Sequence, residues 1–243
     1  QDGVSIVAVG FGGANEQTMR AIASAPSSDF AFFGASMDEV RQHFASDRLC
    51  ELAASPKAPP PPPSTPAPPG LPPSPPSPSP APPSPPACVV KLELVLVLDK
   101  SGSVRAEQSS LLAFAREMVS QFRLDATEGA RVGVVEFSSD AATLTPLTGS
   151  LSDVLTAIDG ASAAGGGTSV SDGLELGRAE VNRGARADVP RTILLLTDGV
   201  QTVDGNDDTA IAKAAAVKQD GVSIVAVGFG GANEQTMRAI ASA

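Results

Sequence analysis

The chain contains no tryptophan and no tyrosine, so nine phenylalanines supply all of its aromatic side chains. Proteins that bind sugars or nucleic-acid bases commonly stack them on aromatic rings, and this composition argues against such a platform. Any hydrophobic core must therefore be built from valine, leucine, isoleucine and alanine.

Basic residues are also few, with 17 Lys and Arg against 27 Asp and Glu and a net charge of -10. This balance repels nucleic acids and anionic lipid surfaces and favours cations. The longest apolar run, around residues 92–98, is too short to span a bilayer and contains Glu93. We therefore expect no nucleic-acid partner and no membrane insertion.

The residues needed for common catalytic sites are missing as well. His43 is the single histidine, and it lies in a helical pattern without a partner motif. No Ser/His/Asp set, Cys/His set or GKS/GKT phosphate loop can be assembled from the chain. We expect that the protein is not an enzyme.

One long segment occurs twice. Residues 1–25 recur without change as residues 219–243, at a spacing of 219 − 1 = 218 residues. That spacing matches a domain plus a linker, so it favours a tandem array in which the chain begins and ends inside a fold. The alternative is an overlap in which one segment was counted twice.

Prolines are concentrated in one segment, since all except Pro26, Pro146 and Pro190 lie within residues 55–87. Fixed φ angles and missing amide donors favour an extended polyproline II rod, on the order of 100 Å long, between two domains. The Ser-Pro and Pro-Pro pattern resembles hydroxyproline-rich glycoproteins of plant and green-algal walls, which implies O-linked glycans. A bare flexible or SH3-binding spacer is the alternative.

After the linker, strand patterns alternate with helical patterns, which predicts an α/β fold with a doubly wound, mostly parallel sheet flanked by helices. The predicted strands are residues 92–99, 130–139, 141–149, 191–199 and 222–230. The predicted helices are residues 104–122, 151–164, 170–181, 208–218 and 234–241. Residues 141–149 are expected at a sheet edge because Pro146 lacks a ladder donor.

Oxygen-bearing side chains follow two of the buried strands. Asp99 ends the first strand and Ser101 and Ser103 follow it, Thr168 lies in a glycine-rich loop, and Asp198 lies at the end of the strand predicted at residues 191–199. Open α/β sheets place their sites at the carboxyl ends of strands. Two carboxylates and three hydroxyls suit Mg²⁺, with Ca²⁺ and Mn²⁺ as alternatives, and they leave coordination positions for water or an outside ligand.

This DxSxS, Thr and Asp order resembles the von Willebrand factor type A (VWA) family with its metal-ion-dependent adhesion site (MIDAS), over residues 88–243. The resemblance implies that Ser101 and Ser103 bind the metal directly, that Thr168 binds it directly or through water, and that Asp99 and Asp198 supply charge. An acidic side chain of a partner protein commonly completes the site. The alternative is that these side chains only cap the helices that follow them.

The resemblance also implies that residues 1–54 are the end of a preceding VWA domain. Residues 29–36 and 37–53 are expected to be the last strand and closing helix of a preceding VWA domain, so that 55–87 is the linker and 88–243 begins the next domain. In VWA domains the end of the closing helix and the start of the first strand lie close together, and in some members a disulfide joins them. We therefore expect Cys50 and Cys88 to pair between adjacent units in an oxidising compartment.

Together these features predict an extracellular structural or adhesive repeat protein that forms a fibre or matrix through divalent-cation-binding domains on glycosylated rods. Self-association with neighbouring repeats or copies is the expected partner interaction. A cell-surface receptor that binds an acidic ligand is one alternative. An intracellular accessory subunit of a Mg²⁺-dependent ATPase or chelatase is another, and the wall-like linker argues against it.

Overall fold

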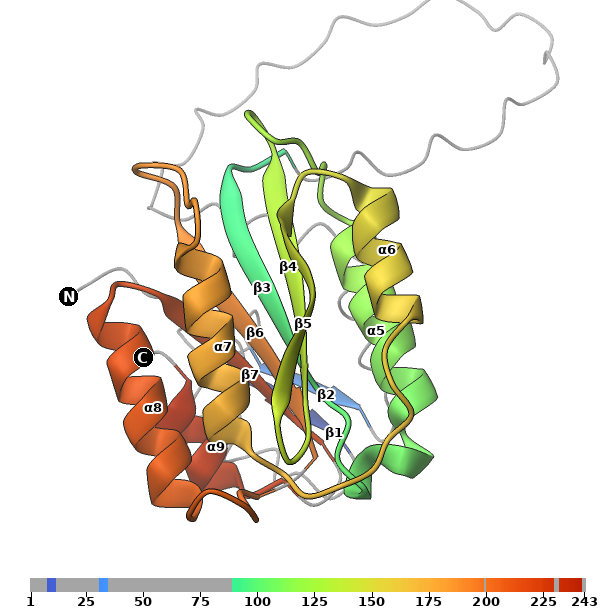
Figure 1. The fold of residues 1–243 in the computed structure, drawn as a ribbon, viewed down its shortest axis with the longest axis vertical. Coiled ribbons are helices and arrows are strands. Elements are labelled where there is room, and N and C mark those ends of the chain that lie inside the picture. The colour runs from blue at the N-terminus through green and yellow to red at the C-terminus, as the bar shows by residue number, and fades with distance from the viewer. Residues whose placement is uncertain (1–7, 12–30, 35–88, 199, 230–231, 242–243) are drawn as a thin grey trace, which may run out of the picture.

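The computed structural model describes residues 8–11, 31–34, 89–198, 200–229 and 232–241 (Figure 1). Its centre is a five-stranded sheet in the order β5-β4-β3-β6-β7. The strands are β3 (Leu92–Asp99), β4 (Ala130–Phe137), β5 (Ala141–Thr148), β6 (Arg191–Thr197) and β7 (Ser223–Gly228). All neighbours pair in parallel except β5, which lies antiparallel to β4 at one edge.

The central position of β3 follows from its sequence. Its eight residues are all buried, and it is hydrogen-bonded on both sides, to β4 and to β6. A strand that is covered on both faces needs a continuous apolar run rather than an alternating one. The mostly parallel α/β sheet predicted from the sequence is confirmed, including the edge position of β5.

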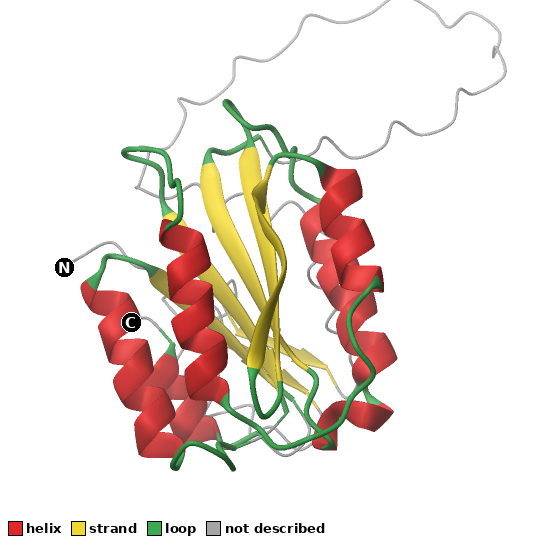
Figure 2. Cartoon of the chain, viewed as in Figure 1, coloured by secondary structure: helices red, strands yellow, loops and turns green. Residues whose placement is uncertain are grey.

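Helices cover both faces of this sheet (Figure 2). They are η1 (Ser103–Ala106), α5 (Gln108–Ser120), α6 (Leu151–Asp159), α7 (Val170–Asn182), α8 (Asp207–Gln219) and α9 (Glu234–Ile240). Helices α5 and α6 lie together on one face, and α7, α8 and α9 lie on the other. The molecule is therefore a three-layer α/β/α structure, which places the loops after parallel strands together at one end.

The core divides into two clusters because successive residues of a strand face opposite sides of the sheet. In β3, the side chains of Leu94 and Leu96 belong to the cluster beneath α5 and α6, whereas those of Val95 and Val97 belong to the cluster beneath α7 and α8. All four are at most 4% exposed, so both faces of the central strand are fully packed.

Two helices differ from the sequence prediction. The helix expected over residues 151–164 ends at Asp159, where Gly160, a residue unfavourable within helices, follows. The helix expected over residues 104–122 is divided into η1 and α5. Glu107 lies between these two parts, with φ −104° and ψ −3°.

The described part of residues 1–54 is a pair of short strands, β1 (Ala8–Phe11) and β2 (Ala31–Gly34), in a parallel two-stranded sheet. β2 falls inside the strand predicted at residues 29–36, and β1 lies close to β7. The predicted closing helix at residues 37–53, the polyproline linker at 55–87, and Cys50 and Cys88 lie outside the described residues.

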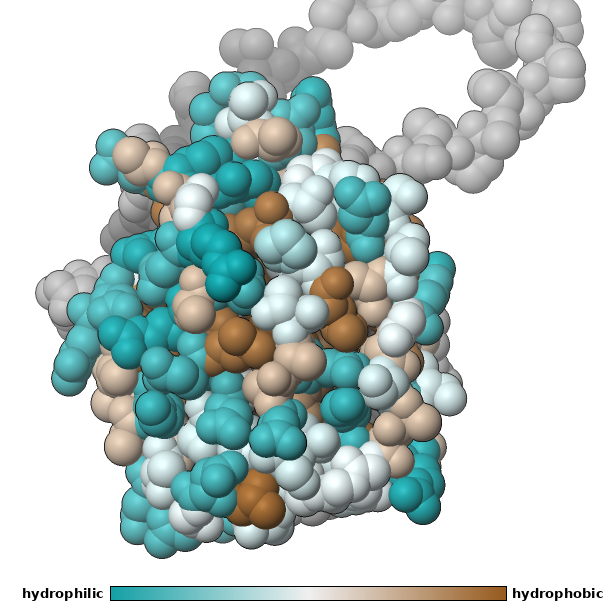
Figure 3. Space-filling model, in the orientation of Figure 1, coloured by the Kyte–Doolittle hydropathy of each residue, from teal (hydrophilic) through white to brown (hydrophobic). Residues whose placement is uncertain are grey.

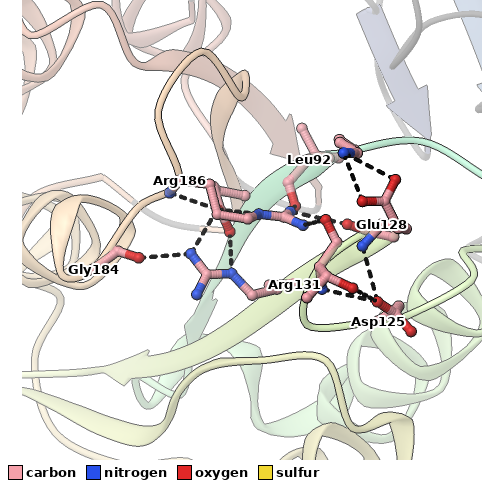
Figure 4. A network of polar contacts seen from close by, with 10 residues as sticks. Leu92, Asp125, Glu128, Arg131, Gly184 and Arg186 are labelled. Carbon is pink, nitrogen blue, oxygen red and sulfur yellow. Dashed lines mark hydrogen bonds and ion pairs between the residues drawn. The ribbon is translucent and has the colours of Figure 1, made fainter.

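At the amino-terminal end of β3, the buried Glu93 accepts hydrogen bonds from Arg131 and Arg186, the two arginines labelled in Figure 4. Arg131 donates two hydrogen bonds to the Glu93 carboxylate, at 2.9 and 2.6 Å, and Arg186 Nε donates a third at 2.8 Å. Arg186 also bonds the carbonyls of Leu92 and Gly129, and therefore ties the loop after α7 to β3 and β4.

No described helix has the length and apolar composition required to cross a membrane.

Candidate metal centre

The loop that follows β3 forms the first part of the site. Asp99 is 2% exposed, and its two carboxylate oxygens have different partners. Oδ1 accepts a hydrogen bond from the Ser101 backbone amide at 2.7 Å, and Oδ2 accepts one from the Thr197 hydroxyl at 2.5 Å. Because Thr197 is the last residue of β6, Asp99 joins the carboxyl ends of two neighbouring strands.

Two serine hydroxyls continue this polar array toward solvent. Ser101 is buried, and its Oγ lies 3.0 Å from Oγ of the exposed Ser103. Ser103 in turn donates to Asp198 Oδ1 at 2.8 Å. Hydrogen bonds therefore link four of the five predicted residues into one group between the ends of β3 and β6.

Thr168, the fifth residue, lies in a loop that is bound to this group through its backbone. The Gly102 amide donates to the Gly166 carbonyl at 3.1 Å, and the Gly165 amide donates to the Lys100 carbonyl at 2.7 Å. Gly166 has a φ of +84°, which disfavours side chains there. Thr168 itself is 4% exposed and is held through its backbone amide by the Thr202 hydroxyl, at 2.8 Å.

The helix-capping alternative does not describe these residues. Ser169, rather than Thr168, is the N-cap of α7 and accepts a hydrogen bond from the Asp172 amide. The residues that cap η1 and α5, Gly102 and Glu107, make no side-chain cap bond. The hydroxyls of Ser101 and Ser103 are directed to each other and to Asp198 instead.

The two carboxylates of the site are electrostatically uncompensated. Burial raises the pKa of Asp99 above its ordinary value, and the nearby charge of Asp198 raises it further. Burial also raises the pKa of Asp198, with a smaller contribution from the charge of Glu107. Neither carboxylate forms an ion pair with a basic side chain among the described residues. A bound divalent cation would supply the missing positive charge.

Lys100, the basic residue within this loop, is engaged elsewhere. Its Nζ lies 3.0 Å from Oε1 of Glu136, the penultimate residue of β4, which is 3% exposed. Burial alone would raise the pKa of Glu136, but hydrogen bonds from the Ser162 amide and from Lys100 outweigh it and hold that pKa below its ordinary value. Lys100 therefore does not neutralise Asp99 or Asp198.

The sequence prediction did not include Glu136 and Ser162. Ser162 donates to both carboxylate oxygens of Glu136, from its amide and its hydroxyl, each at 2.9 Å. This pair fixes the loop after α6, which leads to Thr168, against the end of β4. The available signal was the position of Glu136, an acidic residue within a run of valines and phenylalanine.

These side chains can bind a hard cation only if hydroxyl groups and water molecules join the two carboxylates as ligands. Nowhere in the described part of the chain do three or more His, Cys, Asp or Glu side chains gather at one point. Two carboxylates with serine and threonine hydroxyls are oxygen ligands of the kind that Mg²⁺, Mn²⁺ and Ca²⁺ accept. The exposed position of Ser103 gives the group access to solvent.

Comparison with known proteins identifies the family of the domain. The family model described as the von Willebrand factor type A domain matches residues 93–243. Mouse matrilin-4 is 33% identical over 159 residues, which cover 62% of this chain and 25% of matrilin-4. The mouse collagen alpha-4(VI) chain is 29% identical over 157 residues, covering 63% of this chain and 6% of the collagen chain. The chain thus spans a quarter or less of these relatives.

Among solved structures, proximal thread matrix protein 1 from the mussel byssus, with a zinc-occupied MIDAS motif, has a TM-score of 0.56 and 27% identity. The similarity covers 65% of this chain and 40% of the mussel protein. Manganese-loaded TRAP protein from Plasmodium vivax shares the fold, with a TM-score of 0.53 and 22% identity.

Proposed function

Because the chain belongs to the von Willebrand factor type A domain family, we propose that it is an extracellular adhesive or structural protein whose domain binds partners through a divalent cation. The similarity to matrilin-4, a collagen VI chain and a byssal thread matrix protein supports an extracellular adhesive or structural role. The convergence of Asp99, Ser101, Ser103 and Asp198 carries the proposal.

In this proposal Ser101, Ser103 and Thr168 contribute hydroxyl oxygens to the cation, and Asp99 and Asp198 contribute negative charge. Mg²⁺ is the proposed ion, with Ca²⁺ and Mn²⁺ as alternatives, because the donors are hard oxygens. The occupied MIDAS motif of the mussel relative supports a metal at the equivalent end of the sheet. The bound ion would act as a Lewis acid that attracts an anionic ligand.

The chain's own residues prepare such a site for a partner. The Thr197 hydroxyl and the Ser101 amide hold the Asp99 carboxylate in place, and Glu136 draws Lys100 away from it. Ser103 leaves the group open to solvent on one side. The proposed ligand is an acidic side chain of another protein, since a carboxylate would bind a divalent cation at an open coordination position.

The remaining elements of the proposal concern assembly. VWA domains would alternate with O-glycosylated polyproline rods at residues 55–87, and self-association of repeats or copies would form a fibre or matrix. Support comes from the exact recurrence of residues 1–25 and from the Ser-Pro-rich composition of the linker. Pairing of Cys50 with Cys88 between units would require an oxidising compartment.

Calorimetric titration of the chain with MgCl₂ and MnCl₂ tests the metal site. We expect heat of binding from the unmodified chain and none from Asp99→Asn, which removes one of two charges without changing the size of the side chain. Asp153→Asn is the matched control, because Asp153 is exposed in the first turn of α6. Equal binding by Asp99→Asn and the unmodified chain would refute the assignment.

A further inference from the structure

The face of the molecule over α7, β5 and α6 is a poor docking surface. Its hydrophobic side chains form small patches separated by hydrophilic ones (Figure 3). Stable association through side chains requires a broader apolar area. The end of the sheet is different, because hydrogen bonds there join the loop that carries Thr168 to the loop that follows β6 and begins with Asp198.

Both backbone polar groups of Thr168 are bound to Thr202. The Thr168 amide donates to the Thr202 hydroxyl at 2.8 Å, and the Thr202 amide donates back to the Thr168 carbonyl at 2.8 Å. The Val203 amide reaches the same carbonyl at 3.3 Å. Thr168 is 4% exposed, so its backbone groups depend on these partners rather than on bulk water. Because both groups are held, the direction in which the Thr168 side chain leaves the backbone is fixed as well.

The packing at Gly167 shows how closely the two loops approach. A Cβ atom at Gly167 would lie 2.8 Å from Val203 Cγ1 and 3.4 Å from Thr202 Oγ1. In addition, the Gly167 amide donates to Ser139 Oγ, in the loop after β4, at 2.9 Å. The segment that leads to Thr168 is therefore held by the loops after β4 and β6, and a shift of either loop would move Thr168.

One residue before Thr202, the side chain of Gln201 anchors the loop to a helix. Gln201 is 7% exposed. Its Nε2 donates to Ser171 Oγ at 2.6 Å and to the Val203 carbonyl at 2.7 Å, and its Oε1 accepts from the Ser171 amide at 3.1 Å. Since Ser171 lies in the first turn of α7, these bonds fix the start of the loop against that helix.

The backbone of Gln201 extends this anchor to a second helix. The Gln201 amide donates to Asp207 Oδ1 at 2.9 Å, and Asp207 Oδ2 accepts from the Thr236 hydroxyl at 2.6 Å. Thr236 lies in the first turn of α9, and Asp207 begins α8. The loop after β6 is therefore tied to three helices around the position of Thr202.

We propose that Thr202 is a positioning residue for the proposed metal ligand Thr168, and that Gln201 holds Thr202 in place for this role. Asp198 and Thr202 belong to the same loop, so the contact with Thr168 also sets the separation between two proposed ligands. The inference goes beyond the five residues proposed to hold the ion. It rests on the proposed function, because a positioning role requires an ion to be bound.

The affinity of a metal site depends on how well its ligands are oriented before the ion binds. Side chains that orient a ligand without touching the ion typically change affinity by about 10–100-fold when they are removed. Thr202 is itself exposed to solvent, and substitutions at exposed positions usually have small effects on stability. Loss of its hydroxyl should therefore affect metal binding more than folding.

Calorimetric titration of Thr202→Val and Thr202→Ser with MnCl₂ tests the proposal. Valine keeps the branched shape and removes the hydroxyl, whereas serine keeps the hydroxyl. We expect the dissociation constant to rise about tenfold in Thr202→Val and to stay within about twofold of the unmodified chain in Thr202→Ser. Equal affinity in Thr202→Val and the unmodified chain, or an equal loss in both variants, would overturn the proposal.

Two control variants separate a local effect from general destabilisation. Thr156→Val makes the same substitution at an exposed position of α6. Glu93→Gln weakens the opposite end of β3, where Glu93 binds Arg131 and Arg186. Both should leave the dissociation constant for Mn²⁺ unchanged. A loss of affinity in Glu93→Gln as large as that in Thr202→Val would assign the effect to destabilisation and would overturn the proposal.

Hydrogen exchange in EDTA examines the contact without a metal. The Thr168 amide should exchange about tenfold faster in Thr202→Val than in the unmodified chain, because its acceptor is lost, whereas Thr202→Ser should preserve the unmodified rate. Unchanged exchange of this amide in Thr202→Val would overturn the proposal, since Thr202 would then not hold Thr168.

The unmodified chain distinguishes failure of this proposal from failure of the proposed function. Absence of Mn²⁺ binding by the unmodified chain would refute the metal site and the positioning role together. Binding that is lost in Asp99→Asn but equal in Thr202→Val and the unmodified chain would refute the positioning role alone.

Discussion

At the scale of single residues, four of the buried acidic side chains form two contrasting pairs. Burial alone would raise the pKa values of Glu93 and Glu136, but hydrogen bonds hold both below the ordinary range. The donors are Arg131 and Arg186 at Glu93, and Ser162 and Lys100 at Glu136. Asp99 and Asp198 have no basic partner among the described residues, and burial raises their pKa values. The first group stabilises the fold, and the second is the group proposed to bind a cation.

Glu93→Gln should destabilise the domain by about 3 kcal/mol, because it leaves Arg131 and Arg186 partly buried without a counter-charge. Urea unfolding followed by circular dichroism measures this change. Glu128→Gln is the matched control in the same region. It removes an exposed pair with Lys91 and should cost less than about 1 kcal/mol.

The pH dependence of the Glu93 contribution has a defined sign. Its folded-state pKa lies below the ordinary value of 4.5, so its contribution is complete above that value and is lost as pH falls through the folded-state pKa. The stability difference between the unmodified chain and Glu93→Gln should therefore narrow in acid. A difference that widens below pH 4.5 would contradict the pairing.

At the scale of elements, two glycines allow α7 to pack closely against the central sheet. A Cβ atom at Gly173 would lie 2.8 Å from Phe137 Cδ1 and 3.0 Å from Val97 Cγ1. At Gly177 it would lie 2.8 Å from Val97 Cγ2. These glycines let α7 approach β3 and β4, and so fix the position of the Thr168 loop that precedes the helix.

Gly173→Ala should therefore destabilise the domain by about 1–3 kcal/mol, although alanine has the higher helix propensity. The expected loss of stability would come from steric overlap of the added methyl group with Phe137 and Val97. Glu175→Gln, at an exposed position of the same helix, should change stability by less than about 0.5 kcal/mol. Chemical denaturation of both variants makes the comparison, and a stabilised Gly173→Ala would refute the packing argument.

The main elements of the fold were predictable because each strand carried a strong pattern. The run from Leu92 to Leu98 indicated a buried parallel strand, and Pro146 indicated an edge. The end of α6 and the division at Glu107 were missed, although Gly160 was a local signal for the first of them.

The residues proposed for the candidate site could be named from the sequence, but the side chains that hold them in place could not. The spacing of Asp99, Ser101 and Ser103 placed these side chains in one loop, and strand order brought Asp198 to them. The roles of Thr197, Glu136 and Ser162 depend on contacts between segments far apart in the sequence. No single-sequence pattern specifies such contacts.

At the scale of the whole molecule, the proposed fibre requires a stiff connection between domains. Mass spectrometry of native material tests the proposed linker chemistry directly. Peptides from residues 55–87 should be heavier than the sequence mass by hydroxyl groups and sugars, and deglycosylation should lower that mass. Native peptides at their unmodified mass would contradict the glycosylated rod.

The account depends most on the cation at the ends of β3 and β6. Anomalous diffraction from crystals grown with MnCl₂ locates such an ion without assuming its ligands. The account predicts one strong peak among Asp99, Ser101, Ser103, Thr168 and Asp198, and no peak there in Asp99→Asn crystals. Ordered manganese elsewhere on the domain, with none at these five residues, would contradict it.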